Sequence, residues 1–183
     1  PEFGFARTMS TAGATNVLVV KASRGGGGNT FWDKVAFDAN HTTGHMWGHL
    51  RDTVDAALTA AQNAGYQVQV RGLLYLQGES NGSTEASLAD QRLSSLAANL
   101  QEHINTNFSN AASDMKTVIG EIAASSSNAS RVTTTNLQRS LAASRLGVRS
   151  SAIASWRSPR SISTSRFAIP RTRPRRWRWW AMR

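Results

Sequence analysis

The chain contains no cysteine, and it has only four prolines in 183 residues. Without thiols there is no disulfide, no thiolate metal ligand and no cysteine nucleophile. No apolar run approaches the roughly 20 residues that a transmembrane helix needs. These absences exclude a disulfide scaffold, a cysteine hydrolase and a helical membrane protein, and the length suits one domain of ordinary size.

Acidic residues are missing from the C-terminal part of the chain. Residues 1–130 carry 8 basic and 11 acidic side chains, whereas residues 131–183 carry 13 arginines, no lysine and no acid. The formal net charge of +10 would by itself suggest a nucleic-acid or anionic-membrane partner. Because folded segments usually mix both signs of charge, we treat the two parts separately.

The first part reads as alternating strands and helices. Short apolar runs at Asn16–Lys21, Val68–Leu76 and Met115–Ala123 predict three strands. Apolar residues at helical spacing predict a helix over residues 43–64 and a second, long helix that passes through Leu88, Leu93, Leu96, Leu100 and Ile104. This order implies right-handed crossovers and a parallel, doubly wound sheet.

Capping residues locate the ends of these helices. Gly65 stands where the first helix should end with a glycine cap. Ser83 is the expected N-cap of the second helix, with Glu85 in the favourable first turn.

Ligands of such sheets bind at the carboxyl ends of the strands. In this chain those ends are predicted at Ser23–Asn29, at Gln77–Asn81 and in the Ser/Asn-rich run from Ser125. We therefore expect any site to lie among these three loops.

Two of these loops carry a recognisable pattern. Pro1-Glu2-Phe3-Gly4, then Lys21-Ala-Ser-Arg-Gly-Gly26, then Leu76-Gln-Gly-Glu-Ser-Asn81, occur in this order. Together they resemble the sialate O-acetylesterase and acetylxylan esterase group, carbohydrate esterase family six of the SGNH-type hydrolases. The resemblance covers about residues 1–143, and the Gln-Gly-Glu-Ser-Asn block is its most specific element.

The resemblance implies a flavodoxin-like three-layer α/β sandwich and a serine esterase that removes acetyl groups from carbohydrates without metal or cofactor. It assigns the oxyanion hole to Gly25, Gly26 and Gln77, and support of the loop to Glu79. Glycine lets backbone N–H groups approach a substrate closely, and a glutamine amide is a neutral donor. An extracytoplasmic or secreted location is compatible with the family. The sugar, the oligomeric state and any signal peptide stay open.

The catalytic blocks of the family are not found in this sequence. The family's nucleophile lies in a Gly-Gln-Ser-Asn block upstream of its Gly-Pro-Glu segment, and its base in an Asp-x-x-His or Asp-x-His-Phe element near the C-terminus. Ser23 and Ser80 do not stand in a nucleophile motif. We therefore expect a fold that is incomplete at its N-terminal side and negligible esterase activity.

Histidines recur every four residues at His41, His45 and His49. Two imidazoles at this spacing on one helix face can bind zinc. Gly44 and Gly48 interrupt the segment, and no acidic ligand completes the set. A polar helix face is the preferred interpretation, so we predict no metal site.

The segment 144–183 has no hydrophobic periodicity, and we divide the chain into a partial esterase domain, 1–143, and this tail. Its Arg/Ser/Trp content is typical of coding DNA translated out of frame, and regrouped codons for Ser161–Ser165 permit Asp-Leu-His-Phe. A one-base frameshift near residues 143–150 is our hypothesis. The alternative is a genuine disordered arm whose Arg/Trp cluster binds anionic membranes or single-stranded nucleic acid.

Overall fold

The computed structural model describes residues 2–14, 16–122, 127–144 and 176–182. Its centre is a four-stranded sheet in which every neighbouring pair is parallel. The strands are β1 (Val17–Lys21), β2 (Gln67–Tyr75), β3 (Lys116–Ile119) and β4 (Arg176–Met182), in the order β1-β4-β2-β3. The predicted α/β class with a parallel sheet is confirmed.

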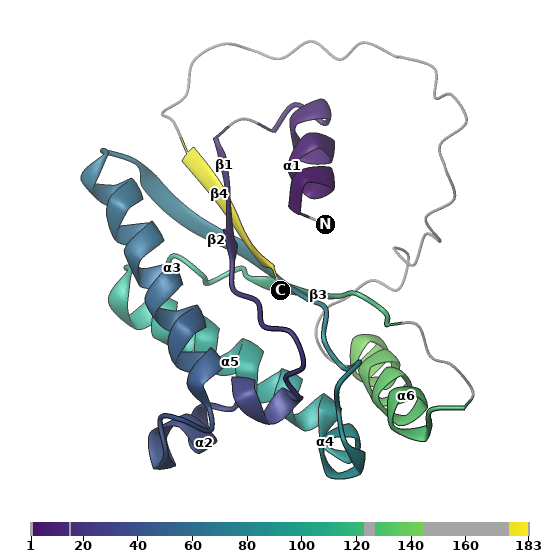
Figure 1. Cartoon of the computed structure of the whole chain (residues 1–183). Helices are drawn as coiled ribbons and strands as arrows, with labels where there is room; N and C mark the ends of the chain where they lie inside the picture. The colour runs from purple at the N-terminus through teal and green to yellow at the C-terminus, as the bar shows by residue number, and fades with distance from the viewer. Residues whose placement is uncertain (1, 15, 123–126, 145–175, 183) are drawn as a thin grey trace, which may run out of the picture.

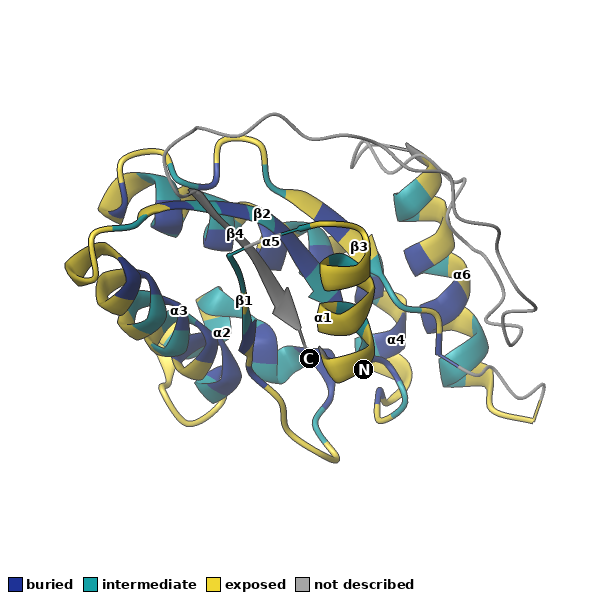
Figure 2. Ribbon diagram, turned by 90° about the horizontal axis from the view of Figure 1, so that it is seen from above, coloured by how far each residue is buried: buried dark blue, intermediate teal, exposed yellow. Residues whose placement is uncertain are grey.

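The helices surround this sheet unevenly. They are α1 (Glu2–Thr11), α2 (Lys34–Ala39), α3 (His45–Asn63), α4 (Ser83–Ser87), α5 (Ala89–Asn107) and α6 (Ala129–Ser144), with a 3-10 turn, η1 (Asn29–Trp32). Figure 1 shows α3 and α5 on one side of the sheet and α1 on the other, with α6 beyond α4. The buried faces of α3 and α5 turn toward the sheet, while α1 is mostly exposed (Figure 2).

The hydrophobic core lies between the sheet and the pair α3 and α5. Leu58, Leu100 and Ile104 are completely buried there, against Val70 and Leu73 of β2. Full burial of one such side chain contributes about 1.5–3 kcal/mol. This core holds the carboxyl ends of β1 and β2 in place.

The sequence predicts β1, α3 and β2 to within a few residues, and Gly65 caps α3 as expected. Gly65 has φ +79°, and its N–H donates to the Gln62 carbonyl at 2.8 Å. The N–H of Tyr66 donates to the Ala61 carbonyl at 3.1 Å. These two bonds form a Schellman motif, which needs a residue in the left-handed region at this point.

Two details of the second helix are predicted wrongly. The N-cap is Gly82 and not Ser83, because Gly82 is extended and its N–H donates to Glu85 Oε2 at 3.0 Å. The helix is also not continuous. At Leu88 the chain makes a tight turn, in which the Leu88 N–H donates a hydrogen bond to the Glu85 carbonyl at 3.3 Å. This turn separates α4 from α5.

The third predicted strand is shorter than expected. β3 covers only Lys116–Ile119, and the N–H of Gly120 adds one more bond to the Tyr75 carbonyl at 2.7 Å. Residues 123–126, which include the start of the third predicted loop, lie outside the described residues.

The C-terminal segment contributes a strand that the sequence does not predict. β4 lies between β1 and β2 and pairs with both. Residues 145–175, with the Ser161–Ser165 block, lie outside the described residues, so the domain boundary and the origin of the tail stay predictions. Within the part that the structure describes, no helix combines the length and apolar character needed to cross a bilayer.

Candidate active site

Two loops meet at the carboxyl edge of the sheet. The glycine loop, residues 22–28, follows β1, and the Gln77 loop, residues 76–82, follows β2. Because β1 and β2 run parallel, both loops leave the same edge of the sheet. The candidate site lies at this edge.

The side chain of Asn81 joins the Gln77 loop to η1, which directly follows the glycine loop. It is 7% exposed, and its Oδ1 accepts the backbone N–H of Asn29 at 3.0 Å and the Gln77 amide at 2.7 Å. Its Nδ2 donates to the Thr134 hydroxyl of α6 at 3.1 Å. A buried amide used in this way is held firmly, because losing any of its partners would leave a desolvated polar atom.

Gln77 is held from three sides. The Tyr75 hydroxyl donates to its Oε1 at 2.8 Å, its Nε2 also donates to the Gly27 carbonyl at 3.3 Å, and its own carbonyl accepts from Gln138 at 3.0 Å. Burial, and then the negative charge of Glu79, raise the pKa of Tyr75 far above its ordinary value. Tyr75 therefore stays a neutral donor, and it orients the Gln77 N–H groups toward the glycine loop.

A second pair of residues anchors the end of the glycine loop. The Glu85 carboxylate accepts the N–H of Gly82 at 3.0 Å and that of Thr30 at 3.4 Å, and its backbone carbonyl accepts from the Asn29 amide at 2.7 Å. Arg92 of α5 donates to Asn29 Oδ1 and to the Thr30 hydroxyl. Glu85 and Arg92 thus tie η1 to α4 and α5.

The pKa of Glu85 follows from these contacts. Partial burial raises it, but the hydrogen bonds from Gly82 and Thr30, together with the charge of Arg92, outweigh burial. The pKa of Glu85 therefore lies below the ordinary value of a glutamate.

The residues singled out from the sequence occupy different parts of this edge. Gly25 and Gly26 are exposed, with Gly26 at φ +70°, and open space surrounds the position of a Cβ on either. Gln77 is buried and reaches the same loop at Gly27. Glu79 is half-buried, and its carbonyl accepts from Arg131 at 3.1 Å.

Several residues that hold the site were not singled out from the sequence. Asn81 was noticed only as the last residue of a motif, and Glu85 only as a residue favourable in a first helical turn. No sequence pattern marked Arg92, Thr134 or Gln138, because their partners lie 53 or more residues away in sequence.

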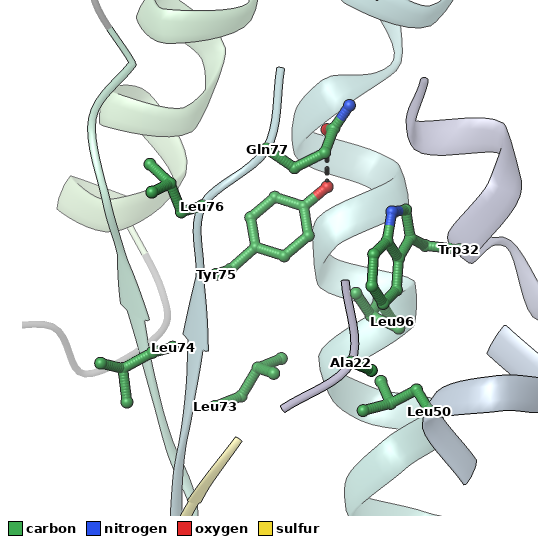
Figure 3. Close-up of a pocket in the computed structure, with 9 residues that line it drawn as sticks. All are labelled: Ala22, Trp32, Leu50, Leu73, Leu74, Tyr75, Leu76, Gln77 and Leu96. Carbon is green, nitrogen blue, oxygen red and sulfur yellow. Dashed lines mark hydrogen bonds between the residues drawn. The ribbon is translucent and has the colours of Figure 1, made fainter. Parts of the chain in front are cut away.

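A small apolar hollow lies beside Gln77. It measures about 290 Å³, including the part open to solvent, and its walls include Ala22, Trp32, Leu73 and Tyr75. Figure 3 shows the Tyr75 ring and the Trp32 indole on its walls, with the Tyr75 hydroxyl directed at Gln77. The hollow therefore has one polar end, at the Gln77 amide.

The histidines do not gather into a cluster. His41 precedes α3 and packs edge-on against Phe37, with ring centroids 4.5 Å apart. His45 Nδ1 faces the Thr42 carbonyl at 2.9 Å, and its Nε2 faces Arg24 at 2.6 Å. Among the described residues, no three His, Asp or Glu side chains lie where they could share a metal ion.

A comparison with known protein families gives a match that covers most of the chain. Residues 1–154 match the family model described as carbohydrate esterase, sialic acid-specific acetylesterase. The chain belongs to this family. The matched region contains both loops and the Asn81 network. No curated protein and no solved structure shows a significant match to the chain.

We predict that Gly28→Ala destabilises the protein while Gly25→Ala does not. Gly28 has an ordinary φ of −76°, but a Cβ there would collide with the Glu85 carboxylate and displace it. The expected loss is about 1–3 kcal/mol of unfolding free energy, as for overpacking. Gly25→Ala is the matched control and should stay within about 0.5 kcal/mol. Urea unfolding of both variants measures the difference, and equal effects would contradict the contact.

Glu85 should make stability depend on pH. Its pKa is lowered in the folded state, so its contribution is present above the unfolded pKa of about 4.3 and is lost as pH falls through the folded pKa. Unfolding free energy measured from pH 7 to pH 3 should therefore fall less steeply in Glu85→Gln than in the unsubstituted chain. The exposed Glu102→Gln is the control, and an unchanged slope in Glu85→Gln would refute the assignment.

Proposed function

We propose that the chain carries the oxyanion-binding part of a fold that removes acetyl groups from glycans, with Gly25, Gly26 and Gln77 as the donors to the oxyanion. The buried Gln77–Asn81 network supports the proposal most strongly. It aims a neutral side-chain donor at the loop that carries two exposed glycines. Fixed donors at the developing oxyanion are the main source of rate acceleration in acyl transfer, and one donor contributes about 3–4 kcal/mol.

The two bonds from Gln77 Nε2 differ in length, and this difference indicates how the donor would work. The bond to Asn81 is 2.7 Å and the bond to the Gly27 carbonyl is 3.3 Å. An oxyanion is a stronger acceptor than a neutral carbonyl. The substrate oxyanion would therefore replace Gly27 as the acceptor, while Asn81 keeps the amide in position.

Glu79 has a supporting role in this proposal. Its carbonyl accepts from Arg131 of α6, and its charge, after the larger effect of burial, helps to raise the pKa of Tyr75. Both effects hold the Gln77 loop, and neither moves a proton to or from substrate.

The serine mechanism of the family needs a nucleophile and a histidine base that the described residues do not provide. Ser23 and Ser80 are exposed, and within the described part of the chain neither contacts a histidine. His103 and Asp55 do pair at 2.8 Å. However, they lie far along α5 and α3, about 15–20 Å from the helix starts that face the site. We therefore propose that the chain as given has negligible esterase activity.

The assay is hydrolysis of p-nitrophenyl acetate by the purified full chain. Loss of a complete triad costs on the order of 10⁶ in rate, so the expected rate is close to the buffer rate and does not change with a fluorophosphonate. Gln77→Leu serves as the matched variant and should lower any residual rate above that of the buffer, because it removes a proposed donor to the oxyanion. Turnover that a fluorophosphonate abolishes would show that a working serine exists and would overturn the proposed inactivity.

The charge of residues 131–183 supports a second proposal, non-specific binding of polyanions. Thirteen arginines without any acid would contact phosphates and release counterions, so affinity should fall steeply with salt. Binding of a single-stranded oligonucleotide should weaken several-fold when Arg171, Arg173 and Arg175 become Gln. The control replaces Arg7, Lys34 and Arg51, and an equal loss in the control would contradict a role of the tail.

A further inference from the structure

β4 lies between β1 and β2 in the sheet, although its residues are the last that the structure describes. Residues Arg178–Met182 pair with Val17–Lys21 of β1. On its other side, β4 pairs with residues of β2 from Gln67 to Leu73, with one irregularity between Val70 and Gly72. The backbone of β4 is therefore in the sheet on both sides.

β1 depends on β4 for its place in the sheet. In the order β1-β4-β2-β3, the neighbour of β1 among the described strands is β4. An empty position would leave two facing rows of unpaired peptide groups, one on β1 and one on β2. Such edges are costly when buried and invite pairing with another strand when exposed.

β4 is also the strand with the longest connection. The 31 residues from 145 to 175 separate it from the end of α6. An extended chain of that length spans up to about 100 Å, which exceeds the size of a domain of this mass. β1, β2 and β3, in contrast, are joined through helices whose side chains form the common core.

We propose that the position between β1 and β2 is a strand-binding site, and that β4 of a second copy of this chain can occupy it in place of the chain's own β4. The contacts would be the same backbone pairs in either case, so exchange costs no specific interaction. Occupancy from within the chain prevails in dilute solution. Exchange becomes significant as the protein concentration approaches the effective concentration of the tethered strand, which is on the order of a millimolar.

The absence of cysteine makes a direct test possible. Val19 of β1 and Trp180 of β4 are register partners. Full chains carrying Val19→Cys alone and Trp180→Cys alone are mixed at about 0.5 mM in a glutathione redox buffer. Strand exchange brings the two different chains into register, so a disulfide should join them, detected by mass spectrometry without reductant.

The matched control mixes Val19→Cys with Arg176→Cys, whose β4 position lies about 13 Å from Trp180 along the strand. We expect at least about tenfold more heterodisulfide from the in-register pair, and a yield that falls on dilution. The pair Val17→Cys and Arg178→Cys, also in register, serves if the first variants do not fold. Equal yields in and out of register would overturn the proposal. The proposal would also be overturned if the Val19→Cys/Trp180→Cys double variant forms its intramolecular disulfide while the mixed single variants form no heterodisulfide.

Discussion

The hydrogen bonds of the Asn81 side chain are the interaction on which the rest of the site depends. One buried amide group binds the backbone N–H of Asn29, the side chain of Gln77 and the hydroxyl of Thr134. These three partners belong to η1, to the Gln77 loop and to α6. A single side chain therefore fixes the positions of these three elements relative to one another. A replacement without both an acceptor and a donor would leave several buried polar groups unpaired.

The proposed oxyanion hole depends on this constraint. An oxyanion hole works only if its donors are in place before charge develops on the substrate. Gln77 is preorganised by Tyr75 and Asn81, and the end of the glycine loop is anchored by Glu85 and Arg92. The exposed glycines themselves are left open to a ligand. This division, with rigid supports beneath an accessible loop, agrees with membership of a carbohydrate acetylesterase family.

Local features of the fold could be predicted from the sequence, whereas long-range features could not. The cap at Gly65 and the strands β1 and β2 depend on neighbouring residues, so their patterns are legible. The contact between Asn29 and Asn81 spans 52 residues, and nothing in either segment marks the other as its partner. β4 was missed because the short alternation Arg176-Trp-Arg-Trp179 was interpreted as part of a cationic-aromatic cluster, and its partners β1 and β2 lie far away in sequence.

Asn81 holds the Gln77 loop against η1 at the end of the glycine loop. Amide hydrogen exchange of the full chain tests this role most directly. The backbone N–H of Asn29 is bound to Asn81 Oδ1, and Asn29 is 2% exposed, whereas Gly25 in the same loop region is exposed. We predict that the Asn29 amide exchanges more slowly than the Gly25 amide by about two orders of magnitude or more, after correction for intrinsic rates. Exchange of Asn29 as fast as that of Gly25 would contradict the account.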